Sequence, residues 1–139
     1  MKTFSGSIEI KSGSRKQIAN ITDRLDELIT NSGIQNGVLT GLVKHSTTFL
    51  IISGIEESLK DVLNLLENII NEEKPSKISV KTNMESVILR SHLQNLIAGA
   101  SISVPLMNGK LDLGERQSIY FVELAGPGDR EISVTIIGE

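Results

Sequence analysis

Apolar residues recur with two different periods in the first part of the chain. From Thr3 to Ile10 they alternate with polar residues, which predicts a strand with one buried face. From Ile21 onward they recur every three to four residues, which predicts a helix. Thr22 is the expected cap of this helix, and Gly33 is expected to end it because glycine accepts a positive φ.

Two short apolar segments follow, GVLTGLVKH and TTFLIISGI. Both are rich in β-branched residues and predict buried strands, either joined by a kink or forming one long bent strand. The clearest helix of the chain comes next, from Glu56 to Glu72, with apolar residues along one face. Pro75 blocks its extension.

After Pro75 the sequence pattern predicts a strand, a helix and then a series of strands. Alternation at Ser76–Lys81 predicts a strand, and Glu85–Ala98 predicts a third helix. SISVPL predicts another strand, and Asn108-Gly109 predicts a hairpin turn of type I′. Two more strands, RQSIYFVEL and REISVTIIG, flank the turn AGPGD. This order predicts an α+β fold: one compact domain over residues 1–139, with a mixed or antiparallel sheet and about three helices.

Composition narrows the functional classes. The chain has 139 residues, of which 39% are hydrophobic and 3% aromatic, with a net charge of −3. A nucleic-acid surface would need a basic stripe or stacking aromatics, so that class is disfavoured. The absence of cysteine excludes disulfides, thiolate metal sites and a cysteine nucleophile. No segment has the apolar length of a signal peptide core or a membrane span, so we expect a soluble cytoplasmic protein.

The stretch KHSTTFLIISGI puts a histidine at the edge of a buried strand. His45 there is a candidate metal ligand or acid–base group, and the alternative is a histidine hydrogen-bonded at a sheet rim. Ser46 and Thr47 could hydrogen-bond a phosphate, or they could be ordinary strand residues.

The second histidine, His92, lies in the predicted third helix near the apolar stripe of Ile88 and Leu96. Alone, a histidine at such a position is more often a hydrogen-bonded packing residue than a ligand. A catalytic zinc site takes about three protein ligands, so two histidines are suggestive but not sufficient. No GxSxG, P-loop or HExxH motif occurs.

A series of short motifs in a fixed order resembles the YjbQ family, also called UPF0047 or secondary thiamine-phosphate synthase. The resemblance runs from about Ile18 to Gly138. The matching positions are Asn20-Ile21-Thr22, Ser32-Gly33-Ile34, Asn36-Gly37, His45-Ser46-Thr47, Ser91-His92-Leu93 with Gly99, Val104-Pro105, Asn108-Gly109-Lys110-Leu111, Leu113-Gly114, Gln117, Gly126-Pro127, Arg130 and Gly138.

The resemblance implies a compact α+β homotrimer with sites near subunit interfaces. It implies weak thiamine-phosphate synthase activity, which joins a pyrimidine pyrophosphate to a thiazole phosphate and releases pyrophosphate. His45 and His92 match histidines that gather a metal such as zinc, and pyrophosphate chemistry suggests Mg²⁺. Substrate-binding candidates are Ser46, Thr47, Gln117 and Arg130, of which Arg130 is the best phosphate anchor because its planar fork binds two oxygens.

The chain departs from the family pattern at three places. It has Ser53-Gly54 where the family usually carries Asn-Glu, and Arg116 where the family has Trp. KTNMESVILRSH lacks a further family histidine. These departures motivate an alternative function, a non-catalytic trimer that binds a small anion or serves in assembly.

Overall fold

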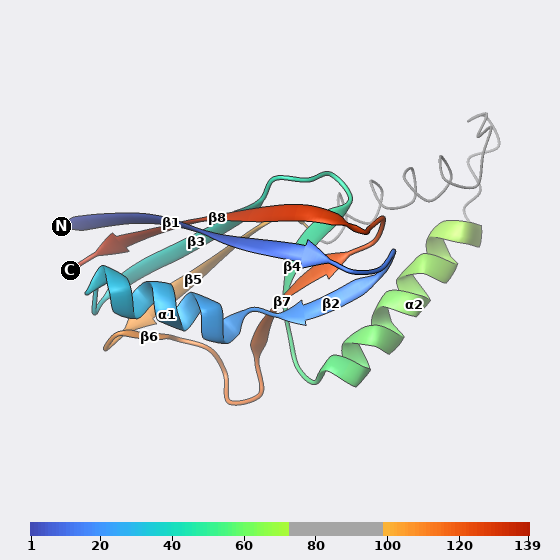
Figure 1. Cartoon of the computed structure of the whole chain (residues 1–139). Helices are drawn as coiled ribbons and strands as arrows, with labels where there is room; N and C mark the ends of the chain where they lie inside the picture. The colour runs from blue at the N-terminus through green and yellow to red at the C-terminus, as the bar shows by residue number, and fades with distance from the viewer. Residues whose placement is uncertain (73–98) are drawn as a thin grey trace.

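The computed structural model describes residues 1–72 and 99–139, which form an α+β domain, as the sequence predicts (Figure 1). Along the described part of the chain, two strands precede helix α1, two lie between α1 and helix α2, and four follow residue 99. The elements are β1 (Lys2–Ser12), β2 (Gln17–Asn20), α1 (Thr22–Ser32), β3 (Gly37–Val43), β4 (Thr48–Ser53), α2 (Glu56–Glu72), β5 (Ser101–Met107), β6 (Lys110–Leu111), β7 (Ser118–Glu123) and β8 (Gly128–Gly138).

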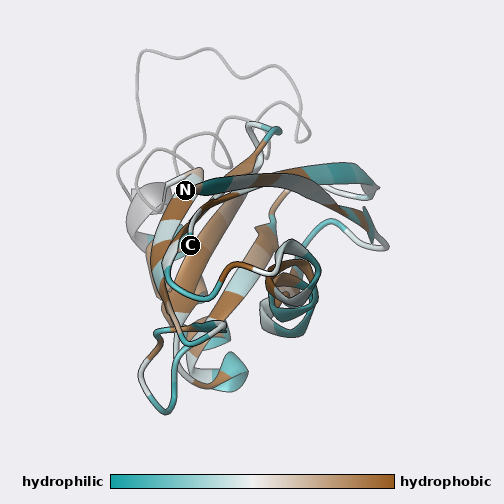
Figure 2. Cartoon of the chain, turned by 90° about the vertical axis from the view of Figure 1, so that its left-hand side faces the viewer, coloured by the Kyte–Doolittle hydropathy of each residue, from teal (hydrophilic) through white to brown (hydrophobic). Residues whose placement is uncertain are grey.

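The strands form two antiparallel sheets. One has five strands in the order β1-β8-β3-β5-β6, and the other has three in the order β2-β7-β4. β1 and β8 pair along their whole length, from Lys2 opposite Gly138 to Ser12 opposite Gly128, so the two chain ends lie side by side (Figure 1). Figure 2 shows stretches of apolar residues, in brown, along several strands of the sheets.

β7 is the central strand of the three-stranded sheet, which has one hydrophobic core on each face. Its Ile119 and Phe121 join the main core, which the inner face of the five-stranded sheet and α1 complete. Its Tyr120 and Val122 face the other way and pack with Leu59 of α2. Because both faces are covered, the sequence of β7 is a nearly continuous apolar run rather than an alternating one.

Helix α1 ends as predicted, with Gly33 in the left-handed conformation at φ 69°. The predicted cap at its start is wrong. Thr22 is the first helical residue, and the side chain of Asn20 takes the capping role, because its Oδ1 accepts from the Thr22 backbone N–H at 3.1 Å. The Thr22 hydroxyl oxygen instead accepts from the backbone N–H of Ile119 at 2.9 Å, which fastens the helix start to β7.

The two apolar segments after α1 are separate strands in different sheets. Neither the kinked nor the single bent strand describes them, because the link Lys44–Thr47 carries the chain from β3 in the five-stranded sheet to β4 in the three-stranded one. The sequence also did not indicate β2, whose four residues are too few to display a period.

Other predictions are confirmed at their residues. Helix α2 spans Glu56–Glu72, and Asn108 and Gly109 both have positive φ, at 54° and 74°. The predicted strand at 76–81 and the predicted helix at 85–98 lie outside the described residues. Neither helix in the described ranges has the length and apolar character needed to cross a membrane.

Candidate functional site

The link Lys44–Thr47 brings His45 to the rim of a cleft of about 620 Å³, called here the His45 cleft. The half-buried His45 is held through its backbone, whose carbonyl oxygen accepts from the Thr48 hydroxyl at 2.9 Å. Its imidazole makes no hydrogen bond with the described residues. The cleft is lined by Glu9, Ile10, Lys11, His45, Asp129, Arg130 and Glu131.

Arg130 lies on β8 at a position that points between the two sheets, in step with the core residues Ile132 and Val134. Its Nε donates a hydrogen bond of 2.6 Å to Oε1 of Glu123, the last residue of β7. The Glu123 side chain is completely buried, and the Arg130 side chain is 16% exposed. The two Nη groups of Arg130 have no hydrogen-bond partner among the described residues.

The carboxylate of Glu123 is surrounded by donors. The Ser12 hydroxyl donates to Oε1 at 2.8 Å, beside Arg130. The Thr47 hydroxyl and the backbone N–H of Ala125 approach Oε2 at 3.5 and 3.4 Å. A buried charge is strongly unfavourable unless it is paired and hydrogen-bonded, and this set of donors meets that condition.

Strand register explains why these groups meet. Ser12 pairs with Gly128 at the end of β1, and its hydroxyl oxygen accepts from the Gly128 backbone N–H at 2.9 Å. The Arg130 guanidinium lies against Gly128, where a Cβ would be only 2.8 Å from the Arg130 Cζ. Because Gly128 has no side chain, the Arg130 guanidinium can occupy this space while its Nε donates to Glu123.

The outer rim of the cleft carries charges of both signs. In the register of β1 and β8, Glu9 lies opposite Glu131, and Lys11 lies opposite Asp129. Like charges directly opposite on neighbouring strands destabilise a sheet, although Lys44 lies 3.6 Å from the Glu131 carboxylate and offsets part of the repulsion. The cleft therefore offers cations together with carboxylates, a set that can hold an anion with its counter-cation.

The structure brings some of the sequence candidates together. His45 and Arg130 line the same cleft, and Thr47 reaches it indirectly through Glu123. Ser46 is exposed in the same link. Gln117 lies at the opposite end of β7 from Glu123, about 20 Å away along an extended strand, and its Oε1 accepts from the Gly114 backbone N–H at 2.8 Å.

The described residues do not by themselves fit a resident zinc ion. They contain no group of three His, Cys, Asp or Glu side chains that could hold a metal. His45 supplies one ligand position, and the predicted partner His92 lies outside the described residues. A zinc centre at His45 and His92 therefore stays a prediction.

Sequence reasoning missed Glu123 and Ser12. A signal for Glu123 was present, because it is the only acid inside the apolar run SIYFVEL, and an acid in a strand covered on both faces needs a buried partner. Ser12 had no comparable signal, since its role depends on the register of β1 with β8.

Comparison of the sequence with known proteins identifies the family of the chain. The family described as UPF0047 protein YjbQ-like matches residues 6–139. The chain belongs to this UPF0047 family. A UPF0047 protein of Methanothermobacter thermautotrophicus is 33% identical over 100% of this chain and 95% of its own length. The UPF0047 protein YugU of Bacillus subtilis is 28% identical over 95% of this chain and 98% of its own length.

Solved structures support the same UPF0047 assignment. A YbjQ-like protein of unknown function from Sulfolobus solfataricus superposes with a TM-score of 0.85 at 32% identity, covering 99% of both chains. A hypothetical protein from Aeropyrum pernix superposes with a TM-score of 0.82 at 32% identity, covering all of both chains. These neighbours establish the family and the fold, and the activity has to be argued from the site.

The buried ion pair predicts a large difference between two glutamates. Glu123→Gln removes a fully buried charge from its partner Arg130, and we expect it to lower the free energy of unfolding by about 2–4 kcal/mol. Glu131→Gln is the matched control, because its ion pair with Lys44 is about half exposed; we expect a change below about 0.5 kcal/mol. Urea unfolding of both variants measures this, and equal effects would contradict the role given to Glu123.

Proposed function

We propose that the His45 cleft binds a small phosphorylated ligand and that the protein catalyses a slow, thiamine-phosphate synthase-like transfer on it. The observation that carries the proposal is the hydrogen bonding of the Arg130 guanidinium. Its Nε is engaged by Glu123, and no described residue hydrogen-bonds to its two Nη groups. A guanidinium already oriented through one nitrogen loses little conformational freedom when its remaining donors bind phosphate oxygens.

The charges of the cleft favour a diphosphate that carries Mg²⁺. Arg130 on the inner side of the cleft and Lys11 on its outer rim supply cations for phosphate oxygens, while Glu9, Asp129 and Glu131 are carboxylates on the outer rim. Mg²⁺ in proteins is commonly held by one or two carboxylates together with substrate phosphates and water. The Mg²⁺ then enters with the substrate, and this binding does not depend on a resident zinc.

The reaction implied by the family resemblance makes few demands on the protein. The bond between the pyrimidine methylene carbon and the pyrophosphate oxygen breaks, and its electron pair leaves with pyrophosphate. The thiazole nitrogen forms the new bond to that carbon with its own electron pair. His45 at the cleft rim is the group that would hydrogen-bond or protonate the leaving pyrophosphate near neutral pH, and Arg130 would stabilise its charge.

A second candidate function keeps the binding and loses the reaction. In this alternative the protein is a non-catalytic binder of a small anion. The specific observation in its favour is in the sequence, which has Ser53-Gly54 and Arg116 where the family usually carries Asn-Glu and Trp.

Binding is tested by calorimetric titration with pyrophosphate in excess Mg²⁺. Arg130→Lys keeps the charge but removes the planar fork, and we expect the affinity to fall roughly tenfold. Arg116→Lys is the matched control, since Arg116 is exposed and does not line the cleft, and it should bind like the original protein. No binding, or equal loss in both variants, would refute the ligand site.

Turnover is tested on the same samples with the pyrimidine pyrophosphate and the thiazole phosphate, with thiamine phosphate and released pyrophosphate as readouts. We expect product above background and a decrease of roughly 10²–10⁴-fold in His45→Ala, the range of general acid–base catalysis. Binding without product would refute the synthase and leave the non-catalytic binder.

The outer face of the five-stranded sheet supports the expected homotrimer. Val38 of β3, Pro105 of β5 and Ile137 of β8 lie in one row across three neighbouring strands. Val38 is 42% exposed and Ile137 43% exposed. The same face continues along β8 from Ile137 to Glu131 of the His45 cleft, about 20 Å away along the extended strand.

Light scattering tests the assembly. We expect a particle of three times the 15.1 kDa chain mass. Val38→Glu should dissociate it, because the charge would be buried in the interface. Val62→Glu is the control, since Val62 is 55% exposed on α2, away from this face, and the variant should stay trimeric. A monomer in the original protein, or a trimer in Val38→Glu, would contradict the proposal.

A further inference from the structure

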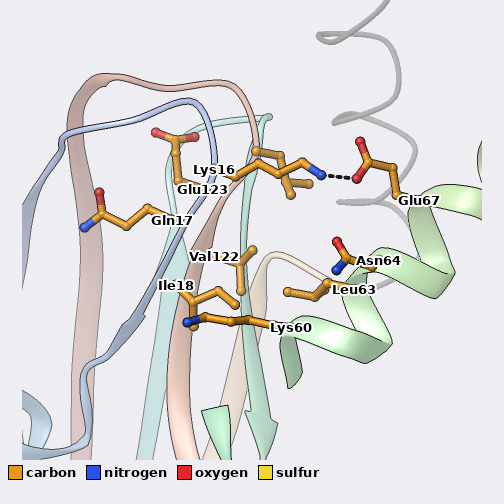
Figure 3. A pocket seen from close by; sticks show the side chains of 10 residues that line it. Lys16, Gln17, Ile18, Lys60, Leu63, Asn64, Glu67, Val122 and Glu123 are labelled. Carbon is orange, nitrogen blue, oxygen red and sulfur yellow. Dashed lines mark hydrogen bonds and ion pairs between the residues drawn. The ribbon is translucent and has the colours of Figure 1, made fainter. Parts of the chain in front are cut away.

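A second cavity, of about 260 Å³, lies between α2 and the three-stranded sheet, on the side away from the five-stranded sheet (Figure 3). We call it the α2 pocket. Its apolar side chains are Ile18 of β2, Leu63 of α2, Val122 of β7 and Leu124, which directly follows β7. Three of these belong to the small core that α2 forms with the sheet, so the pocket is a gap in an otherwise packed layer.

The polar residues of the α2 pocket lie at its rim. Lys16, just before β2, forms an ion pair with Glu67 of α2 across the opening (Figure 3). Lys60 extends from α2 toward Ile18, and Asn64 lies one helical turn farther along. The ion pair of Lys60 with Glu56 at 3.6 Å is about half exposed and therefore weak, so Lys60 can take another partner.

Glu123 borders the α2 pocket without offering it a free charge. Its carboxylate points away from α2 and is saturated by Ser12, Arg130, Thr47 and the Ala125 N–H. The cations at the pocket are Lys16 and Lys60, paired with Glu67 and Glu56 respectively, and the weak, half-exposed pair with Glu56 leaves Lys60 as the cation that a ligand can recruit. The electrostatic preference of this pocket is for an anion.

We propose that the α2 pocket binds a small amphipathic acid, with a single ring or branched aliphatic body on the apolar floor and one carboxylate at Lys60. The volume lies below the range of drug-sized sites, which limits the ligand to about one ring. An apolar floor with a few convergent polar groups is the usual arrangement of a ligand pocket. The site is distinct from the His45 cleft, with which it shares no lining residue.

The test is a titration of the whole ¹⁵N-labelled chain with benzoate, followed by NMR. Benzyl alcohol and benzylamine are the matched neutral and cationic probes. We expect saturable shifts at the amides of Ile18, Leu63 and Val122 with benzoate, weaker ones with the alcohol and none with the amine. Lys60→Gln should weaken benzoate binding about two- to fivefold and leave the alcohol unchanged, as expected for a partly exposed charge pair.

Two substitutions on α2 locate the binding. Asn64→Phe puts a ring into the opening and should abolish the benzoate shifts, while the exposed Val62, which does not line the pocket, gives the control Val62→Phe that should bind normally. The proposal is overturned if benzoate gives no saturable shifts, if benzylamine binds equally, or if Asn64→Phe binds like the original protein. Shifts centred on His45 and Arg130 would also overturn it, because they would assign the acid to the other cleft.

Discussion

The ion pair between Glu123 and Arg130 is the interaction on which the candidate site depends. It occupies the space between the two sheets at the end where β1, β7 and β8 meet, in positions that apolar residues fill elsewhere in the layer. A carboxylate buried to this degree destabilises the fold unless all its neighbours are in place. The pair therefore requires Ser12, Thr47 and Arg130 to come from three distant parts of the chain at once.

This constraint has a functional consequence. Because Glu123 takes only the Nε of Arg130, the guanidinium is fixed at the edge of the His45 cleft with its remaining donors available. The same carboxylate accepts from Thr47, in the link that carries His45. One buried group thus positions both the cation and the histidine, while the mixed charges of β1 and β8 form the opposite rim. Fixing catalytic or binding groups through a second set of contacts is a common way to gain rigidity.

The sequence predicted the parts of the fold that depend on local chemistry. The limits of α2 follow from its apolar period, the end of α1 from Gly33, and the hairpin from Asn108-Gly109, where positive φ is required. What it did not predict depends on distant pairing. β2 is too short to have a period, and the crossing from β3 to β4 is visible only when the two sheets are known.

The site divides in the same way. His45 and Arg130 were identified as candidates, from strand-end chemistry and from the family resemblance, and they do line one cleft. Glu123, which holds Arg130, and Ser12, which donates to Glu123, are 111 residues apart in sequence. Their meeting requires the register of β1 with β8 and the packing of β7 beneath them, and no local pattern specifies that.

The most direct test of the buried ion pair between Glu123 and Arg130 is the solvent exchange of arginine Nε–H groups, measured by ¹⁵N NMR. A slowly exchanging Nε–H for Arg130, set against fast exchange at the exposed Arg15 and Arg116, is what the buried pair predicts; exchange at Arg130 as fast as at those two would contradict it.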